Sequence, residues 1–365
     1  MSIRAAAPLP DAAFWRGRRV LLTGHTGFKG SWLTCWLRQL GADVMGISLP
    51  ELPTDPSLWR QLALNNVLDV RADIAAAADA WTAAARDFSP EIVLHLAAQP
   101  LVSIGYERPA LTFDTNVGGT VRVMSLLEQF PDLLATLVVT TDKVYDPSQT
   151  PPHSEWHHLG GRDPYAASKA AAELVVMSWP PMAAPRATAR AGNVIGGGDW
   201  AAGRLLPDLV CAWESGEQAL LRRPKGVRPW QHVLEPLRGY LVFVEALAAG
   251  GDVPRALNFG PADRQSVSVE ELVGFAAEQW RSLGGRLTEP GWFASGQRHY
   301  DETRELTLDS RLAADRIGWV SALDWQQAVT LTLEWYRALR SGHAAHDLVN
   351  EQLESYATMI FEISS

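Results

Sequence analysis

The chain has 365 residues, enough for one large domain or two closely joined ones with a substantial core. A formal net charge of −9 argues against nucleic acid as a partner, and 47% hydrophobic with 20% charged residues is a globular composition. Cys35 and Cys211 are too few for a metal site or a disulfide framework, so we expect no metal and two buried cysteines in a reducing compartment. Residues 1–10 have no apolar run and 18 consecutive apolar residues occur nowhere, so we expect a cytoplasmic protein without a membrane segment.

Strands and helices alternate in the first half of the chain. Apolar runs typical of strands covered on both faces stand at Arg19–Thr23, Asp43–Ile47, Glu91–Leu96 and Ala135–Thr141. Helical patterns stand at Ser31–Leu40, Asp79–Phe88 and Val117–Gln129. This order predicts an α/β protein with a Rossmann-type, doubly wound parallel sheet.

The pattern changes after Arg190, where glycine, proline and tryptophan become frequent. We therefore expect residues 14–190 to form a dinucleotide-binding domain. Residues 191–231 and 261–340 are expected to form a smaller, irregular α/β substrate-binding lobe. A helix at Pro236–Ala249 and a strand near Leu257 indicate that residues 232–260 return to the sheet. Residues 341–365 are expected to form a C-terminal helical tail.

A glycine motif, Gly24-His-Thr-Gly27-Phe-Lys-Gly30, follows the first expected strand and precedes the first helix. The pattern alone is weak, because helix-packing glycines imitate it. Its position favours nucleotide binding, since glycines let the backbone approach a pyrophosphate at a helix N-terminus. The spacing differs from the Gly-x-Gly-x-x-Gly of ordinary NAD dehydrogenases.

Two further motifs carry chemistry: Thr141-Asp142-Lys143 and Tyr165-x-x-x-Lys169. In the second, the positive charge of Lys169 is expected to lower the pKa of the Tyr165 phenol, so that tyrosine takes a hydroxyl proton while hydride leaves the same carbon. A lone Tyr-x-x-x-Lys is usually a solvated pair, but the nucleotide motif upstream reverses that interpretation. Simple hydride transfer has no use for an acid and an amine beside this relay. Elimination of water needs both, so the sequence predicts a dehydratase.

The chain resembles the extended short-chain dehydrogenase/reductase family over roughly residues 14–340. His95-Leu-Ala-Ala-Gln99 resembles the loop against the cofactor, and Asn116 matches a helix asparagine that supports the active site. Longer strings resemble the CDP-glucose 4,6-dehydratase branch of this family: Thr23–Trp32, Ala97–Val102, Arg190–Trp200, Arg228–Leu237 and Asn258–Pro261. The stretch between Lys169 and Arg190 is shorter than in that family, and the loop Asp146–Gly161 is rich in proline.

The resemblance implies three groups of site residues. The catalytic group is Thr141, Asp142, Lys143, Tyr165 and Lys169. The cofactor group is Gly24, Thr26, Gly27, Phe28, Lys29, Asp73, Ile74, Leu96, Ala97, Ala98, Thr115, Tyr165 and Lys169. The substrate group is Gln99, Asn193, Arg204, Arg228 and Glu302. The implied cofactor is NAD, although Leu49-Pro50-Glu51 stands where an acid usually meets the ribose, so NADP stays open, with Lys29 near a 2′-phosphate.

The implied substrate is a nucleotide-diphosphate sugar, and the implied reaction converts CDP-glucose to CDP-4-keto-6-deoxyglucose, a step of deoxysugar and lipopolysaccharide biosynthesis. Lys143 would remove the carbon 5 proton and Asp142, protonated when buried, would protonate the leaving 6-hydroxyl. Alternatively the two form an ion pair that transfers neither proton. A dehydratase for dTDP-glucose or GDP-mannose, a 4-epimerase and an inactive cofactor-sensing regulator remain as alternatives. A homodimer is expected through the helices that flank Tyr165 and Val117.

Overall fold

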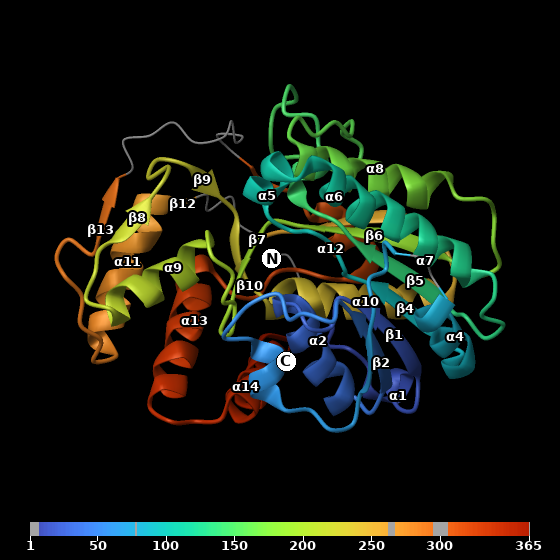
Figure 1. The fold of residues 1–365 in the computed structure, drawn as a ribbon, viewed down its shortest axis with the longest axis horizontal. Coiled ribbons are helices and arrows are strands. Elements are labelled where there is room, and N and C mark those ends of the chain that lie inside the picture. The colour runs from blue at the N-terminus through green and yellow to red at the C-terminus, as the bar shows by residue number, and fades with distance from the viewer. Residues whose placement is uncertain (1–6, 77–78, 262–266, 295–305, 365) are drawn as a thin grey trace.

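The centre of the molecule is a parallel seven-stranded sheet, with the strand order β11-β6-β5-β4-β1-β2-β3 (Figure 1). A computed structural model describes residues 7–76, 79–261, 267–294 and 306–364. The strands are β1 (Arg19–Thr23), β2 (Asp43–Ser48), β3 (Leu68–Arg71), β4 (Ile92–His95), β5 (Ala135–Val139), β6 (Arg186–Ala191) and β11 (Ala256–Phe259). The order runs outward in both directions from β1, which is the doubly wound topology. The predicted fold class is confirmed.

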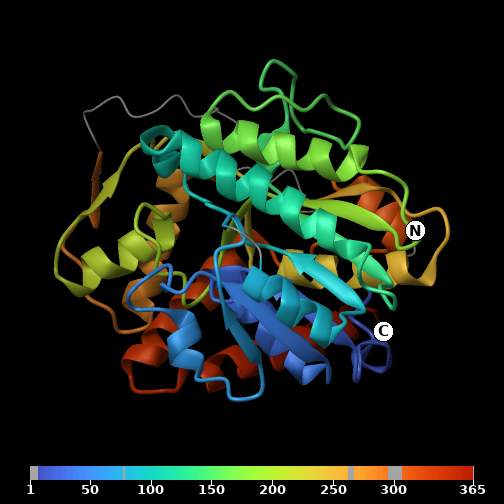
Figure 2. The ribbon, with the colours of Figure 1, turned by 45° about the vertical axis from the view of Figure 1, so that its right-hand side comes forward.

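Helices cover both faces of the sheet (Figure 2). Val20 and Leu22 of β1 pack on one side, in a buried cluster with α2 (Phe28–Gln39) and α10 (Leu234–Ala249). Leu21 packs on the other side, in a cluster with α4 (Asp79–Phe88) and α7 (Gly119–Leu127). Because successive side chains point to opposite faces, a strand covered on both faces is apolar throughout. The remaining helices of this part are α1 (Ala12–Trp15), α3 (Leu58–Leu62), α5 (Val102–Glu107), α6 (Pro109–Phe113), α8 (Pro164–Ser178) and α12 (Arg311–Ile317).

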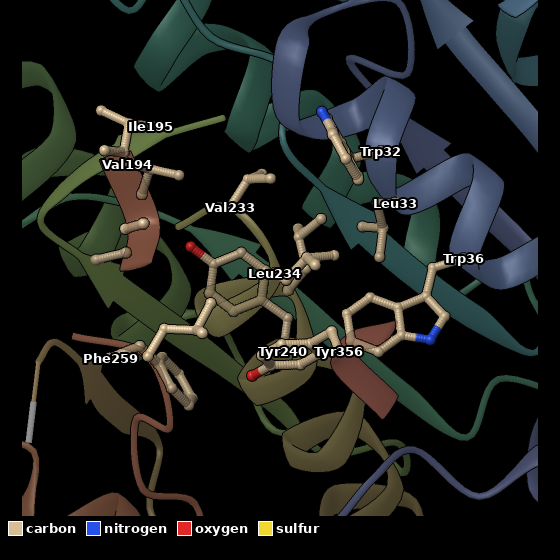
Figure 3. Close-up of a cluster of buried hydrophobic side chains, with 14 of the residues drawn as sticks. Trp32, Leu33, Trp36, Val194, Ile195, Val233, Leu234, Tyr240, Phe259 and Tyr356 are labelled. Atoms are coloured by element: carbon tan, nitrogen blue, oxygen red, sulfur yellow. The ribbon is translucent and has the colours of Figure 1, made fainter. Parts of the chain in front are cut away.

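The larger cluster is rich in aromatic side chains (Figure 3). Trp32 and Trp36 of α2, Tyr240 of α10 and Phe259 of β11 are all at most 5% exposed. Tyr356 joins them from α14 (Ala345–Ser364), which packs against α2, α3 and α13 (Trp325–Arg340). Each such side chain contributes about 1.5–3 kcal/mol of burial free energy, so this cluster fastens the C-terminal helix to the sheet.

A smaller group of elements lies beside the carboxyl ends of the strands, on the left in Figure 1. Its strands form three short pairs: β7 (Asn193–Ile195) with β10 (Trp230–His232), β9 (Val227–Arg228) with β12 (Val267–Ser268), and β8 (Ala219–Leu221) with β13 (Trp292–Ala294). Its helices are α9 (Leu205–Glu214), α11 (Val269–Ser282) and α13 (Trp325–Arg340). The expected strand near Leu257 is β11, which pairs with β6 in the main sheet. The division of the chain into domains stays a prediction.

Three local expectations are corrected. Helix α2 begins at Phe28 rather than Ser31, because the last glycine of the motif lies inside its first turn. The helix expected at Val117–Gln129 is α7 preceded by a π-helical turn, Asp114–Gly118, that joins it to α6. Cys35 is buried, but Cys211 is exposed, because on α9 the core-facing positions are Leu209, Val210 and Trp213. Among the described helices, none is long and apolar enough to cross a bilayer.

Candidate active site

A cavity of about 670 Å³ opens where the carboxyl ends of the strands meet the smaller group of elements. Every residue expected to bind the cofactor lines it: Gly24, Thr26, Gly27, Phe28, Lys29, Asp73, Ile74, Leu96, Ala97, Ala98, Thr115, Tyr165 and Lys169. The catalytic candidates Thr141 and Lys143 and the substrate candidates Gln99, Asn193, Arg204 and Arg228 line it as well. Asp142 lies behind this surface, 1% exposed, and Glu302 lies outside the described residues. Ligands of open α/β sheets bind at this end of the strands.

The glycine motif builds a tight backbone cradle at one end of the cavity. Gly24 has φ +79°, and a Cβ on it would lie 2.7 Å from the Ala97 nitrogen. A Cβ on Gly30 would lie 2.1 Å from the Gly24 carbonyl oxygen. Side chains are therefore excluded at both positions, and Gly27 caps α2 so that its N-terminus starts at the cavity wall. This cradle fits the diphosphate of a dinucleotide.

The Thr141-Asp142-Lys143 motif forms a single tight turn just after β5. The Thr141 hydroxyl donates to Asp142 Oδ1 over 3.0 Å, and the Lys143 ammonium lies 3.1 Å from the same oxygen. Asp142 Oδ2 is buried and has no hydrogen-bond partner among the described residues. This oxygen faces Gly192, which lies between β6 and β7. A Cβ on that glycine would lie 3.4 Å from the oxygen. The ion pair that the sequence left open is thus formed in this structure.

Tyr165 and Lys169 project from the first two turns of α8, which Asp163 caps by accepting from the Ala166 nitrogen. Contrary to the sequence-based expectation, burial raises the pKa of Tyr165 to about 12, although Thr141 and Arg204 act in the lowering direction. The Lys169 ammonium donates to the Val139 carbonyl oxygen, 2.9 Å away. Burial in turn lowers the pKa of Lys169 to about 8, against the attraction of Glu173.

Asn116 lies in the π-helical turn and is 1% exposed. Its amide donates to the Ser168 hydroxyl over 2.8 Å, and its carbonyl oxygen accepts from the Gln99 nitrogen over 2.8 Å. It therefore joins the loop after β4 to the helix that carries Tyr165. The Gln99 side chain itself bonds Thr112 and the Leu101 nitrogen, so it shapes the loop.

Cationic side chains from the smaller group of elements line the cavity. Arg228 lies on β9, and Arg204 caps α9 and pairs with the buried Asp199 over 3.7 Å. Arg222 and Arg223, which the sequence analysis did not single out, also line the cavity. Their dibasic sequence next to Pro224 was the signal that could have found them. Asp199 was missed too, although it directly follows Gly196-Gly197-Gly198.

Lys29 lies at the catalytic end of the cavity. Its ammonium is 5.9 Å from the centroid of the Tyr240 ring. Burial, followed by repulsion from Arg204 and Lys169, lowers the pKa of Lys29 to about 7. The side chain is thus among the catalytic groups, while its backbone belongs to the glycine cradle.

A glycine turn after the first strand, a helix carrying Tyr-x-x-x-Lys and a threonine at the end of β5 together define an extended short-chain dehydrogenase/reductase. Residues 20–260 match the model of the NAD dependent epimerase/dehydratase family, and the chain belongs to this family.

Relatives of known activity match almost the whole chain. The CDP-glucose 4,6-dehydratase of Salmonella typhimurium is 38% identical over 346 residues, which cover 90% of this chain and 93% of the relative. A dTDP-glucose 4,6-dehydratase of Xanthomonas campestris is 25% identical, over 87% of this chain and 92% of the relative.

Solved structures share the fold at lower identity. The epimerase Mth375 of Methanothermobacter thermautotrophicus superposes with a TM-score of 0.78 at 20% identity, over 93% of this chain and 96% of the other. The dTDP-glucose 4,6-dehydratase DesIV of Streptomyces venezuelae, solved with NAD, gives a TM-score of 0.75 at 23% identity, over 88% of this chain and 98% of the other.

Proposed function

We propose that the protein is an NAD-dependent nucleotide-sugar 4,6-dehydratase that converts CDP-glucose to CDP-4-keto-6-deoxyglucose and water. The observation that carries the proposal is the turn after β5, where the Thr141 hydroxyl and the Lys143 ammonium both contact Oδ1 of Asp142. Reductases and epimerases need the tyrosine relay but no such pair. The 38% identical relative named for this activity supports the choice of CDP-glucose.

The cofactor would be held by the glycine cradle and by the loops after β3, β4 and β5 that line the cavity. An oxidised nicotinamide supplies a hydride acceptor, later a hydride donor, and a positive ring charge. Burial raises the pKa of Tyr165 to about 12. Positive charge close to the phenol would lower this pKa and help Tyr165 to give up its proton.

In the first half of the reaction, Tyr165 takes the proton of the sugar 4-hydroxyl while carbon 4 is oxidised to a ketone. The Thr141 hydroxyl turns from Asp142 to the same oxygen, and both hydroxyls stabilise the negative charge that forms there when carbon 5 loses its proton. Lys169 anchors the strand end through the Val139 carbonyl oxygen and holds positive charge at the back of the site.

In the second half, Lys143 removes the carbon 5 proton and Asp142 protonates the departing 6-hydroxyl. An ion pair serves neither step. However, one proton shift across 3.1 Å converts the pair to a neutral amine and a neutral acid. Substrate binding excludes water from the cavity, and a dry site favours the neutral pair, because isolated charges are costly there. The proton then lies on Asp142 Oδ1, the oxygen that faces Lys143 and Thr141.

The diphosphate of the substrate would lie against Arg228 and Arg204, with the Asn193 amide beside them. All three line the cavity and belong to the smaller group of elements. Glu302 is proposed for the ribose or base. The fit is electrostatic, since two arginines can neutralise a diphosphate bidentately.

A panel of nucleotide sugars tests this function. We expect CDP-glucose, and not dTDP-glucose or GDP-mannose, to give the alkaline absorbance of a 4-keto-6-deoxy product. Formation of a 4-epimer without water loss would make the protein an epimerase. Stoichiometric NAD binding without turnover of any sugar would make it a cofactor-binding regulator.

We further propose a cytoplasmic homodimer formed through α7 and α8. The two helices lie side by side on one outer face, next to α5 and α6 (Figure 1). These four helices carry five large apolar side chains, each at least 36% exposed: Tyr106, Phe113, Val121, Leu174 and Met177. Such a patch is typical of an interface. Light scattering should give a dimer for the native chain and a monomer for the Leu174→Lys, Met177→Lys variant. A monomeric native chain would contradict the proposal.

A further inference from the structure

His25, inside the glycine motif, is fully buried and has no part in the chemistry proposed above. Its ring lies under β2, edge-on to Trp59 with 4.5 Å between ring centroids. A Cβ on Gly46 of β2 would lie 2.3 Å from the ring of His25. Only glycine at this position of β2 leaves room for the histidine ring, so strand and ring are fitted to each other.

A chain of hydrogen bonds fixes the tautomer of His25. Nε2 lies 2.9 Å from Asp69 Oδ1, and the other oxygen of Asp69 accepts from Arg71 over 2.7 Å. A carboxylate oxygen only accepts, so Nε2 carries the hydrogen. Burial lowers the pKa of His25, and the charge of Arg71 acts in the same direction. Asp69 and the Ile47 carbonyl act in the raising direction but do not offset the burial. In the resulting neutral ring, Nδ1 is an acceptor.

Ser48, the last residue of β2, is the next member of this chain. Its Oγ lies 3.0 Å from His25 Nδ1 and 3.2 Å from the Thr26 nitrogen. The one hydroxyl hydrogen is donated to Nδ1, and one lone pair accepts from the Thr26 N–H. A hydroxyl has one donor and two acceptor positions, so only one lone pair remains. Since Ser48 lines the cavity, it offers a ligand an acceptor and no donor.

We propose that Ser48 selects NAD over NADP by accepting a hydrogen bond from the 2′-hydroxyl of the adenosine ribose, with its direction fixed by His25 and Asp69. The inference rests on the proposed use of NAD. The end of β2 is where Rossmann folds contact this ribose, usually through an acid. A 2′-hydroxyl can donate to the free lone pair. A 2′-phosphate dianion has no hydrogen to donate and meets that lone pair together with Glu51 and Asp73, which also line this end.

The cations that could hold a 2′-phosphate are engaged elsewhere. Arg71 donates to Asp69 and, over 3.4 Å, to the Leu49 carbonyl oxygen. Lys29, which the sequence suggested for this role, extends instead to Tyr240 at the catalytic end. Neither neutralises a phosphate beside Ser48. The serine therefore replaces the acid that the sequence lacks at this position.

The direct test pairs a change in the protein with a change in the ligand. Calorimetry measures the Kd of cofactor-free native protein, Ser48→Ala and Ser48→Thr for NAD and for its 2′-deoxyadenosine analogue. We expect the native protein and Ser48→Thr to bind the analogue about threefold to tenfold more weakly than NAD, the range of one hydrogen bond. Ser48→Ala should bind both alike and lose part of the discrimination against NADP. Equal binding of NAD and the analogue by native protein, or an unchanged preference in Ser48→Ala, would overturn the proposal.

Two further analogues test the direction of the hydrogen bond. At pH 8, an NAD analogue with a 2′-amino group in the adenosine can still donate, whereas a 2′-fluoro analogue cannot. The native protein should bind the amino analogue nearly as well as NAD and the fluoro analogue as weakly as the deoxy one. The reverse order would mean that Ser48 donates. Absence of any NAD binding would contradict the proposed function itself. Dehydration with NAD but without a preference for the 2′-hydroxyl would contradict this inference alone.

Discussion

The ammonium of Lys143 lies 3.1 Å from Asp142 Oδ1, while the other oxygen of this buried carboxylate has no partner among the described residues. In the proposed elimination, this ion pair is the resting form of the acid and the base. A single proton shift would convert the pair into its working form. This relationship separates the proposed dehydratase from enzymes that need Tyr165 and Lys169 alone.

Asp142→Asn should separate the two halves of the reaction. The amide keeps the shape of the carboxyl group but gives no proton to the 6-hydroxyl, so dehydration should slow by about 10² or more. Carbon 4 should still be oxidised, and reduced cofactor should accumulate in a single turnover, visible in the nicotinamide absorbance band. Asp146→Asn, which changes a partly exposed acid four residues away, is the matched control and should behave as native. Normal dehydration in Asp142→Asn would make the acid and the amine a structural pair.

Tyr165→Phe should abolish sugar oxidation and leave cofactor binding nearly intact, because only the phenol is lost. Removal of a positioned general base costs about 10²–10⁴ in rate. Stopped-flow absorbance measures the oxidation step and calorimetry measures NAD binding. Native turnover in this variant would remove Tyr165 from the mechanism.

Arg228→Ala should raise the KM for the nucleotide sugar more than it lowers kcat. A cation that holds the diphosphate acts alike on the bound substrate and on the transition state. Steady-state kinetics with Arg162→Ala, an exposed arginine, as the control measures the effect. An unchanged KM would move the diphosphate to Arg204, whose guanidinium already faces Asp199.

Lys169 should make the cofactor-free protein more stable in alkali. Burial lowers its pKa from 10.5 to about 8. Below pH 8 the side chain is protonated in both the folded and the unfolded chain, and the buried charge destabilises the folded state. Between pH 8 and 10.5 only the unfolded chain holds it, so the free energy of unfolding rises with pH through this window. The free energy of unfolding of the native protein should therefore rise, relative to that of Lys169→Met, by up to about 3 kcal/mol.

Urea unfolding at pH 7.5 and 10 measures this difference. Lys225→Met replaces an exposed lysine and should show no such pH dependence. A pH-independent difference for Lys169→Met would mean that the ammonium is solvated in the folded chain.

The sequence predicted the fold and most of the cavity because their signals are local. The glycine motif stands between a strand and a helix, and the apolar runs lack alternation, so cradle and sheet follow from short stretches of chain. Every named cofactor and substrate residue within the described part lines one cavity for the same reason. Their individual roles stay predictions.

The misses depend on contacts between distant segments. The pKa of Tyr165 is raised because the folded chain buries the phenol. Neither this burial nor the contact of Lys169 with Val139 is visible in Tyr-x-x-x-Lys. The link between His25, Ser48 and Asp69 joins residues 23 and 44 positions apart. A sequence pattern shows a histidine in a glycine loop but not the strand glycine that admits it.

The most direct test of the account follows one hydrogen atom. CDP-glucose with deuterium at carbon 4 is converted by the enzyme, and NMR and mass spectrometry locate the deuterium in the product. The account predicts a 4-keto-6-deoxy sugar with the deuterium at carbon 6, because the hydride removed by oxidation returns within the same site. Deuterium retained at carbon 4 of a hexose, or lost to a released cofactor, would contradict a 4,6-dehydratase.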